Sequence, residues 1–105
     1  MLLIREIMYC KPGKVRLMVE KFVAMAKLME KYDQGRMKVM TDFAAERYWT
    51  IVSEFEVENM EAFGKMMSGE DSTYSAEDMK QMDELMKGYH ELVEYGRREI
   101  YKIEH

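Results

Sequence analysis

Residues 48–57 read Tyr-Trp-Thr-Ile-Val-Ser-Glu-Phe-Glu-Val, the longest run dense in β-branched and aromatic residues in the chain. Because side chains alternate between the two faces of a strand, this run presents two rows. The odd-numbered row, from Trp49 to Val57, is mostly apolar and predicts packing against helices. The even-numbered row, from Tyr48 to Glu56, begins with apolar or aromatic residues and ends in two carboxylates. Such a row suits neither a wetted surface nor a dry core, so we predict a central strand with two different faces.

The rest of the chain alternates between strand-like and helix-like patterns around this central strand. Apolar residues at steps of three and four predict the helices, and Asn59 and Ser75 are the predicted N-caps of the second and third. Gly88 is expected to weaken the third helix without ending it, since glycine costs a helix about 1 kcal/mol relative to alanine. The predicted elements are strands at 2–10, 36–41 (a short charged edge strand), 48–57 and 97–104, and helices at 14–32, from Asn59 to Gly69 and from Ser75 to Gly96.

The 105 residues fit a single domain spanning positions 1–105. With 16 basic and 20 acidic residues the formal charge is −4, and no basic patch of the kind that binds nucleic acid is present. The apolar runs are too short to span a membrane and the start lacks a signal-peptide pattern, so we expect a cytoplasmic location. Cys10 is the single cysteine, so no internal disulfide is expected. The two distant histidines predict no metal site, and the 13 methionines predict an adaptable core.

The predicted order of elements is typical of an α+β ferredoxin-like sandwich (β-α-β-β-α-β), a four-stranded antiparallel sheet with helices on one face. The opposite face then lacks helices but is expected to carry some of Leu2, Ile4, Met8, Tyr48 and Val52, along with Glu6 or Arg5, and it is too apolar to remain wet. A second copy of the sheet, related by a two-fold axis, is the simplest cover, so we expect a homodimer that closes a dimeric α/β barrel. The pattern leaves open which parity of the first strand faces inward, and therefore whether Arg5 or Glu6 is the interior charge.

Three segments together resemble a known superfamily. They are Lys11-Pro12-Gly13-Lys14 after the first strand, the run 48–56 followed by Met60-Glu61-Ala62-Phe63, and Gly96-Arg97-Arg98-Glu99-Ile100-Tyr101 at the end. Over nearly the whole chain they resemble the dimeric α/β-barrel superfamily, and within it the NIPSNAP-like and antibiotic-biosynthesis-monooxygenase-like families.

This resemblance implies a homodimeric barrel that binds a small apolar or aromatic molecule. The superfamily includes cofactor-independent monooxygenases, isomerases and cyclases, so an aromatic or polyketide-like substrate is one expectation. Its haem-degrading branch uses an Asn, a Trp and a His around the porphyrin. The corresponding positions here carry Glu6 and Glu56, and no histidine follows in the second helix. Haem breakdown is therefore not expected, and neither is any other cofactor.

Two carboxylates are the candidate catalytic residues, Glu6 and Glu54. If both point into the barrel from neighbouring strands, a partly desolvated carboxylate serves as a general base toward an acidic carbon or a phenol. The alternative is that each pairs with an arginine, so that the chain is a non-catalytic binding or assembly module with structural carboxylates. The segment 68–74 is a candidate lid or an ordinary connection. The candidate ligand-binding residues are Tyr48, Val52, Glu56, Arg98 and Tyr101.

Overall fold

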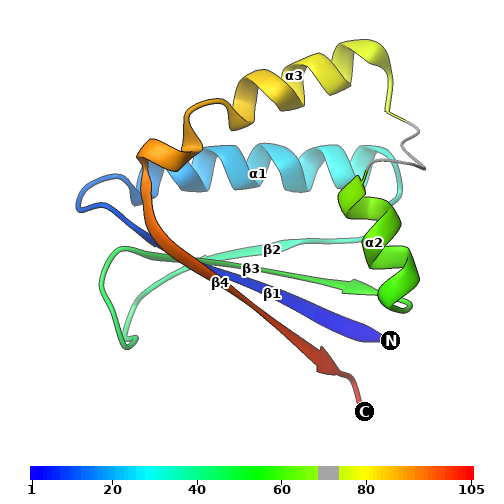
Figure 1. Ribbon diagram of the computed structural model, residues 1–105, viewed down its shortest axis with the longest axis horizontal. Helices are drawn as coiled ribbons and strands as arrows, with labels where there is room; N and C mark the ends of the chain where they lie inside the picture. Colours follow the sequence, from blue (N-terminus) through cyan, green and yellow to red (C-terminus); the bar gives the residue numbers. More distant parts are fainter. Residues whose placement is uncertain (69–73) are drawn as a thin grey trace.

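The computed structural model describes residues 1–68 and 74–105, and Figure 1 shows its elements. In chain order they are β1 (Leu2–Cys10), α1 (Val15–Lys31), β2 (Lys38–Thr41), β3 (Thr50–Val57), α2 (Met60–Ser68), α3 (Ala76–Met86), the 3₁₀ turn η1 (Tyr89–Glu91) and β4 (Val93–Lys102). Within these ranges no helix is both long and apolar enough to cross a membrane.

The four strands form one antiparallel sheet in the order β2-β3-β1-β4. The helices lie on one face of this sheet, and α2 sits beside the end where β3 finishes (Figure 1). This arrangement confirms the predicted α+β ferredoxin-like sandwich. The two central strands are β1 and β3, as right-handed crossovers require.

The core lies between the sheet and the helices. Ile4 from β1, Ile51 from β3 and Met18 from α1 are fully buried there, and Phe22 and Phe63 pack into the same cluster. Complete burial of an aliphatic side chain of this size stabilises the fold by about 2 kcal/mol relative to exposure. The apolar row from Ile51 to Val57 packs on the helices as its alternation predicts.

The register assigns the two rows of β1 to opposite faces, which the sequence left open. Ile4 pairs with Phe55, and Glu6 pairs with Ser53, so the even-numbered residues of β1 share the helix side with the odd-numbered residues of β3. The odd-numbered residues, including Arg5, lie on the helix-free face.

The central strand begins two residues later than predicted. Trp49 adopts a left-handed backbone with φ 61°, a conformation that a strand cannot continue. Asp42 closes the preceding loop, because its Oδ1 accepts a hydrogen bond from Thr50 N at 2.9 Å. Tyr48 and Trp49 therefore lie in the loop, and the expectation that Trp49 belongs to the core row is wrong, since 41% of it is exposed.

The third helix is shorter than predicted. It ends at Met86, and Gly88 takes a left-handed conformation with φ 80° that starts η1. Gly88 therefore ends the helical path, and the expectation that Gly96 does so is wrong. Gly96 lies inside β4 opposite Met8, and β4 starts at Val93 rather than at residue 97. An extended backbone at Lys87 and a positive φ at Gly88 together redirect the chain.

The two predicted N-caps are confirmed. Asn59 Oδ1 accepts from Ala62 N at 2.8 Å, and Ser75 Oγ accepts from Asp78 N at 3.1 Å. The predicted stop at Gly69 and the candidate lid at 68–74 fall largely outside the described residues.

Candidate ligand-binding cleft

A cleft of about 1180 Å³ lies between the helices and the sheet. Small-molecule sites span about 300 to 1,000 Å³, so this cleft has room for a ligand and ordered water. It exists because α3 runs along α1 and stands off the sheet (Figure 1). No apolar residue of α3 is fully buried. The apolar stripe of this helix therefore lines the cleft without being fully covered by other side chains.

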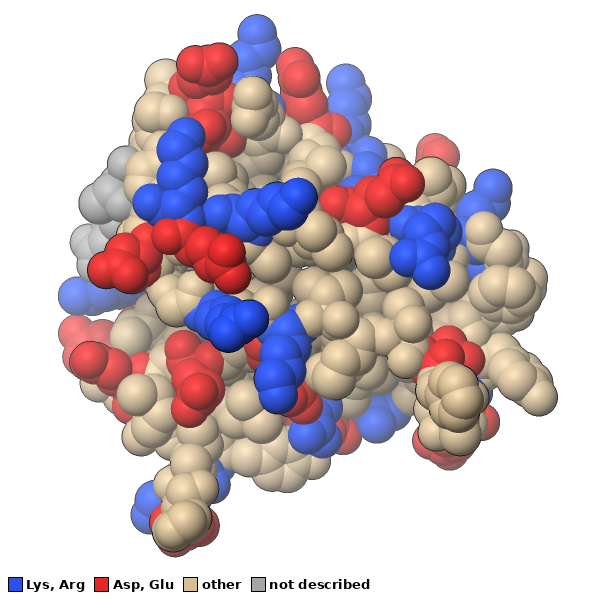
Figure 2. All heavy atoms as spheres, turned by 180° about the vertical axis from the view of Figure 1, so that it is seen from behind, with Lys and Arg blue, Asp and Glu red and all other residues tan. Residues whose placement is uncertain are grey.

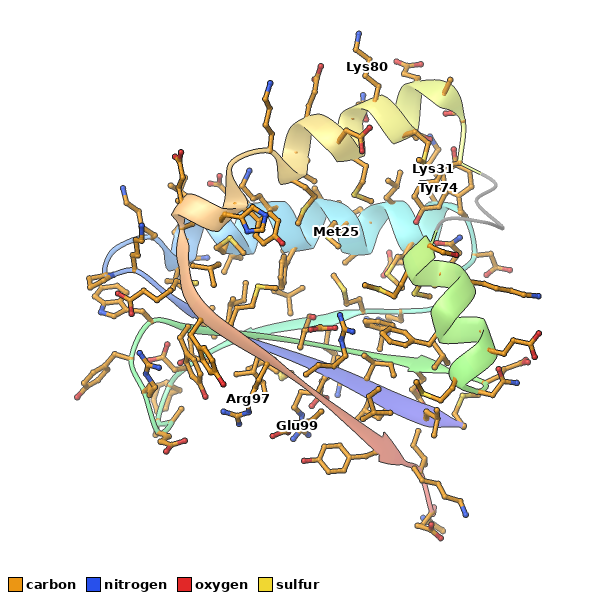
Figure 3. The ribbon with its side chains drawn as sticks, in the orientation of Figure 1. Met25, Lys31, Tyr74, Lys80, Arg97 and Glu99 are labelled. Atoms are coloured by element: carbon orange, nitrogen blue, oxygen red, sulfur yellow. The ribbon has the colours of Figure 1, made fainter. Side chains whose placement is uncertain are left out.

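Methionine dominates the walls of the cleft. Ten of the chain's 13 methionines contribute to it, and they come from every layer around the space. The helices supply Met25 and Met29 (α1), Met66 and Met67 (α2), and Met79, Met82 and Met86 (α3). The others come from the N-terminus, from β1 and from the segment before β2. Figure 3 shows Met25 on the side of α1 that faces the sheet. Flexible thioether side chains adapt to irregular contents, so these walls can reshape around a ligand.

A single polar row crosses the otherwise apolar floor of the cleft. Ser53 of β3, Glu6 of β1 and Arg98 of β4 are consecutive cross-strand partners on the helix side of the sheet. The flanking rows are apolar: Phe55 and Ile4 on one side, and Ile51 and Met8 on the other. The floor therefore offers polar groups at one defined level only.

Glu6 and Arg98 form an ion pair through Oε1 and Nε. The side chain of Glu6 is 17% exposed and that of Arg98 is 41% exposed. The guanidinium also lies over the Phe63 ring, with Cζ 5.0 Å from the ring centroid. This packing fixes Arg98 in place while the pair remains reachable from the cleft. A carboxylate beside a held cation can accept a proton or a hydrogen bond, and the guanidinium can donate to an oxygen.

The charge around the cleft is mainly acidic. Among the described lining residues five are acidic and two, Lys65 and Arg98, are basic. Apart from Glu6, the acidic residues are Asp33, Glu56, Glu58 and Glu61. Lys65 pairs with Glu61 along α2 at 3.8 Å. The cleft therefore disfavours an anion by its local charge.

A polar cluster holds the start of α3 against the end of α1 (Figure 3). Asp78 is 6% exposed, and its Oδ2 accepts from Lys31 Nζ at 2.8 Å and from the Tyr32 hydroxyl. The Tyr32 hydroxyl in turn accepts from Ser75 N at 2.8 Å. The hydrogen bond from Lys31, with that from Tyr32, holds the pKa of Asp78 below its usual value. We call these four residues the α1–α3 latch, because they attach one methionine-bearing wall of the cleft to the core.

The helix-free face carries a different charge network. Arg5 Nε donates to Glu54 at 2.7 Å, and its Nη1 lies 3.4 Å from Glu99 Oε1. The Tyr101 hydroxyl donates to the same Glu99 oxygen at 2.9 Å, and this hydrogen bond is the main reason that the pKa of Glu99 lies below its usual value. Figure 3 shows Arg97 and Glu99 projecting from β4 on the side away from the helices.

Exposed aromatic side chains accompany that network. Phe43 and Tyr48 in the loop between β2 and β3 are 103% and 85% exposed, and Tyr95 of β4 is 57% exposed. Arg47 of the same loop stacks over Tyr9, with Cζ 4.3 Å from the ring centroid. On the side of the molecule seen in Figure 2, charges of both signs are interspersed, without a continuous basic patch.

The structure separates the residues that the sequence singled out. Glu6 and Arg98 meet on the floor of the cleft, and Glu56 lies at its rim. Glu54, Val52 and Tyr101 lie on the helix-free face, so the two candidate catalytic carboxylates are not brought together. Tyr48 is in the exposed loop, outside both clusters.

Sequence reasoning missed the methionine walls. The spacing Met79-Met82-Met86 and the pair Met25-Met29 place these side chains on one face of each helix, and this signal was available. Only the tertiary structure shows that these stripes surround an open cleft rather than fill the core. Among the described residues no group of three or more His, Cys, Asp and Glu side chains could hold a metal ion.

No protein-family model and no curated protein matches the chain, but solved structures share its fold. A NIPSNAP-like domain protein from Burkholderia xenovorans has a TM-score of 0.72 at 12% identity, covering 97% of this chain and 84% of that one. A NIPSNAP family protein from Agrobacterium tumefaciens has a TM-score of 0.73 at 7% identity, covering 96% and 90%. A candidate antibiotic biosynthesis monooxygenase from Deinococcus radiodurans has a TM-score of 0.69 at 10% identity, covering 100% and 94%.

These likenesses confirm at the level of fold the resemblance noted from the sequence. At identities this low they show the fold alone, and activity depends on the residues of the cleft.

Proposed function

We propose that this protein binds a small molecule in the methionine-lined cleft of each subunit. The observation that carries the proposal is the polar row Ser53–Glu6–Arg98, which crosses an otherwise apolar sheet floor beneath walls in which methionine predominates. Ligand sites commonly combine an apolar lining with a few convergent polar groups. The candidate antibiotic biosynthesis monooxygenase that shares this fold supports a small-molecule role, and the composition of the cleft supports this cleft as the binding site.

The chemistry that this row supports best is proton abstraction. Glu6 is the general base, taking a proton from an acidic carbon or a phenol. Arg98 stabilises the negative charge that develops on the adjacent oxygen of the substrate. Such a step begins isomerisation or cyclisation, and in a cofactor-independent monooxygenase it produces the carbanion or phenolate that then donates electrons to dioxygen.

We further propose that two copies assemble through their helix-free faces. Exposed Phe43, Tyr48 and Tyr95 and the half-exposed Tyr101 make that region too apolar for a free surface. The network around Arg5 already pairs its charges within one subunit, so an isologous contact can cover them without leaving a cation unpaired. A dimer of this kind leaves the cleft open, because the cleft lies on the other side of the sheet.

The test of the base uses nitrobenzisoxazole as an apolar probe. Removal of its ring C–H proton breaks the N–O bond and releases a coloured cyanophenolate, with the proton passing to the base. We expect the protein to accelerate this reaction and Glu6→Gln to abolish the acceleration. Glu54→Gln is the matched control, since Glu54 is an arginine-paired carboxylate on the opposite face, and it should leave the rate unchanged. A rate that survives Glu6→Gln would contradict the assignment.

The second candidate is a non-catalytic binding or assembly module. The engagement of Glu6 by Arg98 favours it, because one oxygen of this carboxylate already accepts a hydrogen bond from the guanidinium. In that case the probe binds without reacting, and Glu6→Gln changes affinity and stability instead of rate.

A further inference from the structure

We infer that the cleft takes an unbranched aliphatic chain whose head is neutral or cationic and donates a hydrogen bond to Glu6. This inference rests on the proposed function and names the class of ligand for the same cleft.

The preference for a flexible chain follows from the walls. Methionine is unbranched and rotates about three side-chain bonds, so a wall of methionines conforms to a chain in several shapes and does not impose a plane. The lining also holds aromatic rings, but three of them already stack or tilt against protein rings. Tyr74 stacks on Tyr32 with centroids 4.4 Å apart, Tyr89 lies 4.0 Å from His90, and Phe55 lies 6.2 Å from Phe63.

A planar aromatic ligand gains most from free ring faces at stacking distance. With these rings partly engaged, the methionines provide most of the remaining contact area. The walls therefore fit an aliphatic chain better than the aromatic or polyketide-like substrate that the resemblance implies.

The preference for a donor head follows from the floor. Arg98 is occupied on two sides, by the carboxylate of Glu6 and by the face of the Phe63 ring. An anionic head would have to displace Glu6 from Arg98 and leave that carboxylate without its cation. An ionised carboxylate has about four lone-pair sites, so Glu6 can accept a further hydrogen bond while it remains paired. Ser53 lies next to Glu6 across the strands and extends the same row.

The net charge of the cleft lining also favours a neutral or cationic head over an anionic one. The described lining carries five carboxylates and two cations, a local net charge of −3. This charge attracts a cationic head and repels a carboxylate or a phosphate.

The experiment compares three eight-carbon probes below their aggregation concentrations: octylamine, octanol and octanoate. Binding is read from the methyl signals of protein labelled with carbon-13 at methionine. Ten methionines line the cleft, whereas Met18, Met40 and Met60 do not, and these three serve as internal controls. We expect octylamine to bind tightest, octanol next and octanoate at least about tenfold more weakly than octylamine. The shifts should be confined to the cleft methionines.

Two variants and one further probe sharpen the test. Glu6→Gln should remove most of the preference for octylamine over octanoate, whereas the matched control Glu54→Gln should preserve it. Naphthylmethylamine has the same head on a rigid aromatic body and should bind more weakly than octylamine.

Each contrary result overturns a defined part of the account. If octanoate binds as tightly as octylamine while the cleft methionines shift, the head preference is wrong and the proposed binding cleft stands. If naphthylmethylamine binds more tightly than octylamine, the preference for a flexible chain is wrong. If no probe shifts the cleft methionines, the inference and the proposed function both fail.

Discussion

The two faces of the sheet carry the same kind of ion pair in opposite settings. On the helix side Glu6 of β1 pairs with Arg98 of β4, and one residue earlier Arg5 of β1 pairs with Glu99 of β4 and Glu54 of β3 on the other side. The first pair belongs to the polar row Ser53–Glu6–Arg98, which lies beneath the methionine walls of the cleft. The second belongs to a network next to exposed aromatic side chains. The comparison teaches that the role of a charged side chain in a strand depends on what packs against its face of the sheet. Because successive residues point to opposite faces, Arg5 and Glu6 lie in different surroundings although they are neighbours in β1.

The largest expected contrast comes from truncating neighbours in β1. Ile4→Ala removes a fully buried side chain from the helix side and should lower the free energy of unfolding by about 3 kcal/mol. Leu3→Ala removes a partly buried side chain from the helix-free face and should cost less than about 1 kcal/mol in dilute protein, where we expect the proposed dimer to dissociate. Urea unfolding monitored by circular dichroism measures both. Equal losses in dilute protein would mean that the two faces are equally buried within one subunit.

A smaller effect should follow from removing the centre of the helix-free network. Arg5→Met leaves Glu54 and Glu99 without their shared guanidinium, and should cost about 1 to 2 kcal/mol because the pairs are partly exposed. The unfolding midpoint in urea measures this loss. Binding of octylamine in the cleft should be unchanged, and a parallel loss of that binding would show that the two faces do not act separately.

Removing the N-cap of α3 tests whether this wall of the cleft can be destabilised without affecting the sheet. Ser75→Ala removes the oxygen that accepts from Asp78 N and should cost about 1 kcal/mol. Hydrogen exchange should quicken in α3 and remain unchanged in β2 and β3, which contribute no residue to the latch. If β2 and β3 lost protection to the same degree as α3, the wall could not be regarded as a separately held unit.

How far the sequence predicts the molecule depends on whether the signal is local. The bounds of β1 are predicted because Pro12 and Gly13 end an apolar run, and the caps at Asn59 and Ser75 because side chain and backbone lie three residues apart. Gly88 is misjudged because its left-handed conformation depends on where β4 must begin. The inward parity of β1 is open from the sequence because both of its rows contain apolar residues, and only the register with β3 decides it.

The candidate site shows the same division. Glu6 and Arg98 are both identified from the sequence, but their pairing needs the β1–β4 register. Glu54 is separated from Glu6 because the residue opposite Glu6 is Ser53. The methionine cleft depends on α3 standing off the sheet, which no short segment encodes.

The smallest expected effect is the response of the α1–α3 latch to acid. Lys31 and Tyr32 lower the pKa of Asp78 in the folded protein, so its carboxylate stabilises the fold fully above the unfolded value of about 4. That contribution is lost as the pH falls through the lower folded value. Asp78→Asn should therefore reduce the melting temperature at pH 7 and flatten its decline below about pH 4. Asp83→Asn, at an exposed position of the same helix, is the control and should follow the wild type.

One measurement addresses the division between the two faces most directly: methionine methyl spectra recorded with a soluble paramagnetic agent. Met40 lies on the helix-free face and is 37% exposed, whereas Met67 lines the cleft and is 57% exposed. At high protein concentration we expect Met40 to be protected from the agent and Met67 to be broadened. Dilution should expose Met40, and octylamine should then protect Met67 alone. Protection of Met40 by octylamine, or of Met67 by raising the protein concentration, would reverse the assigned roles and contradict the account.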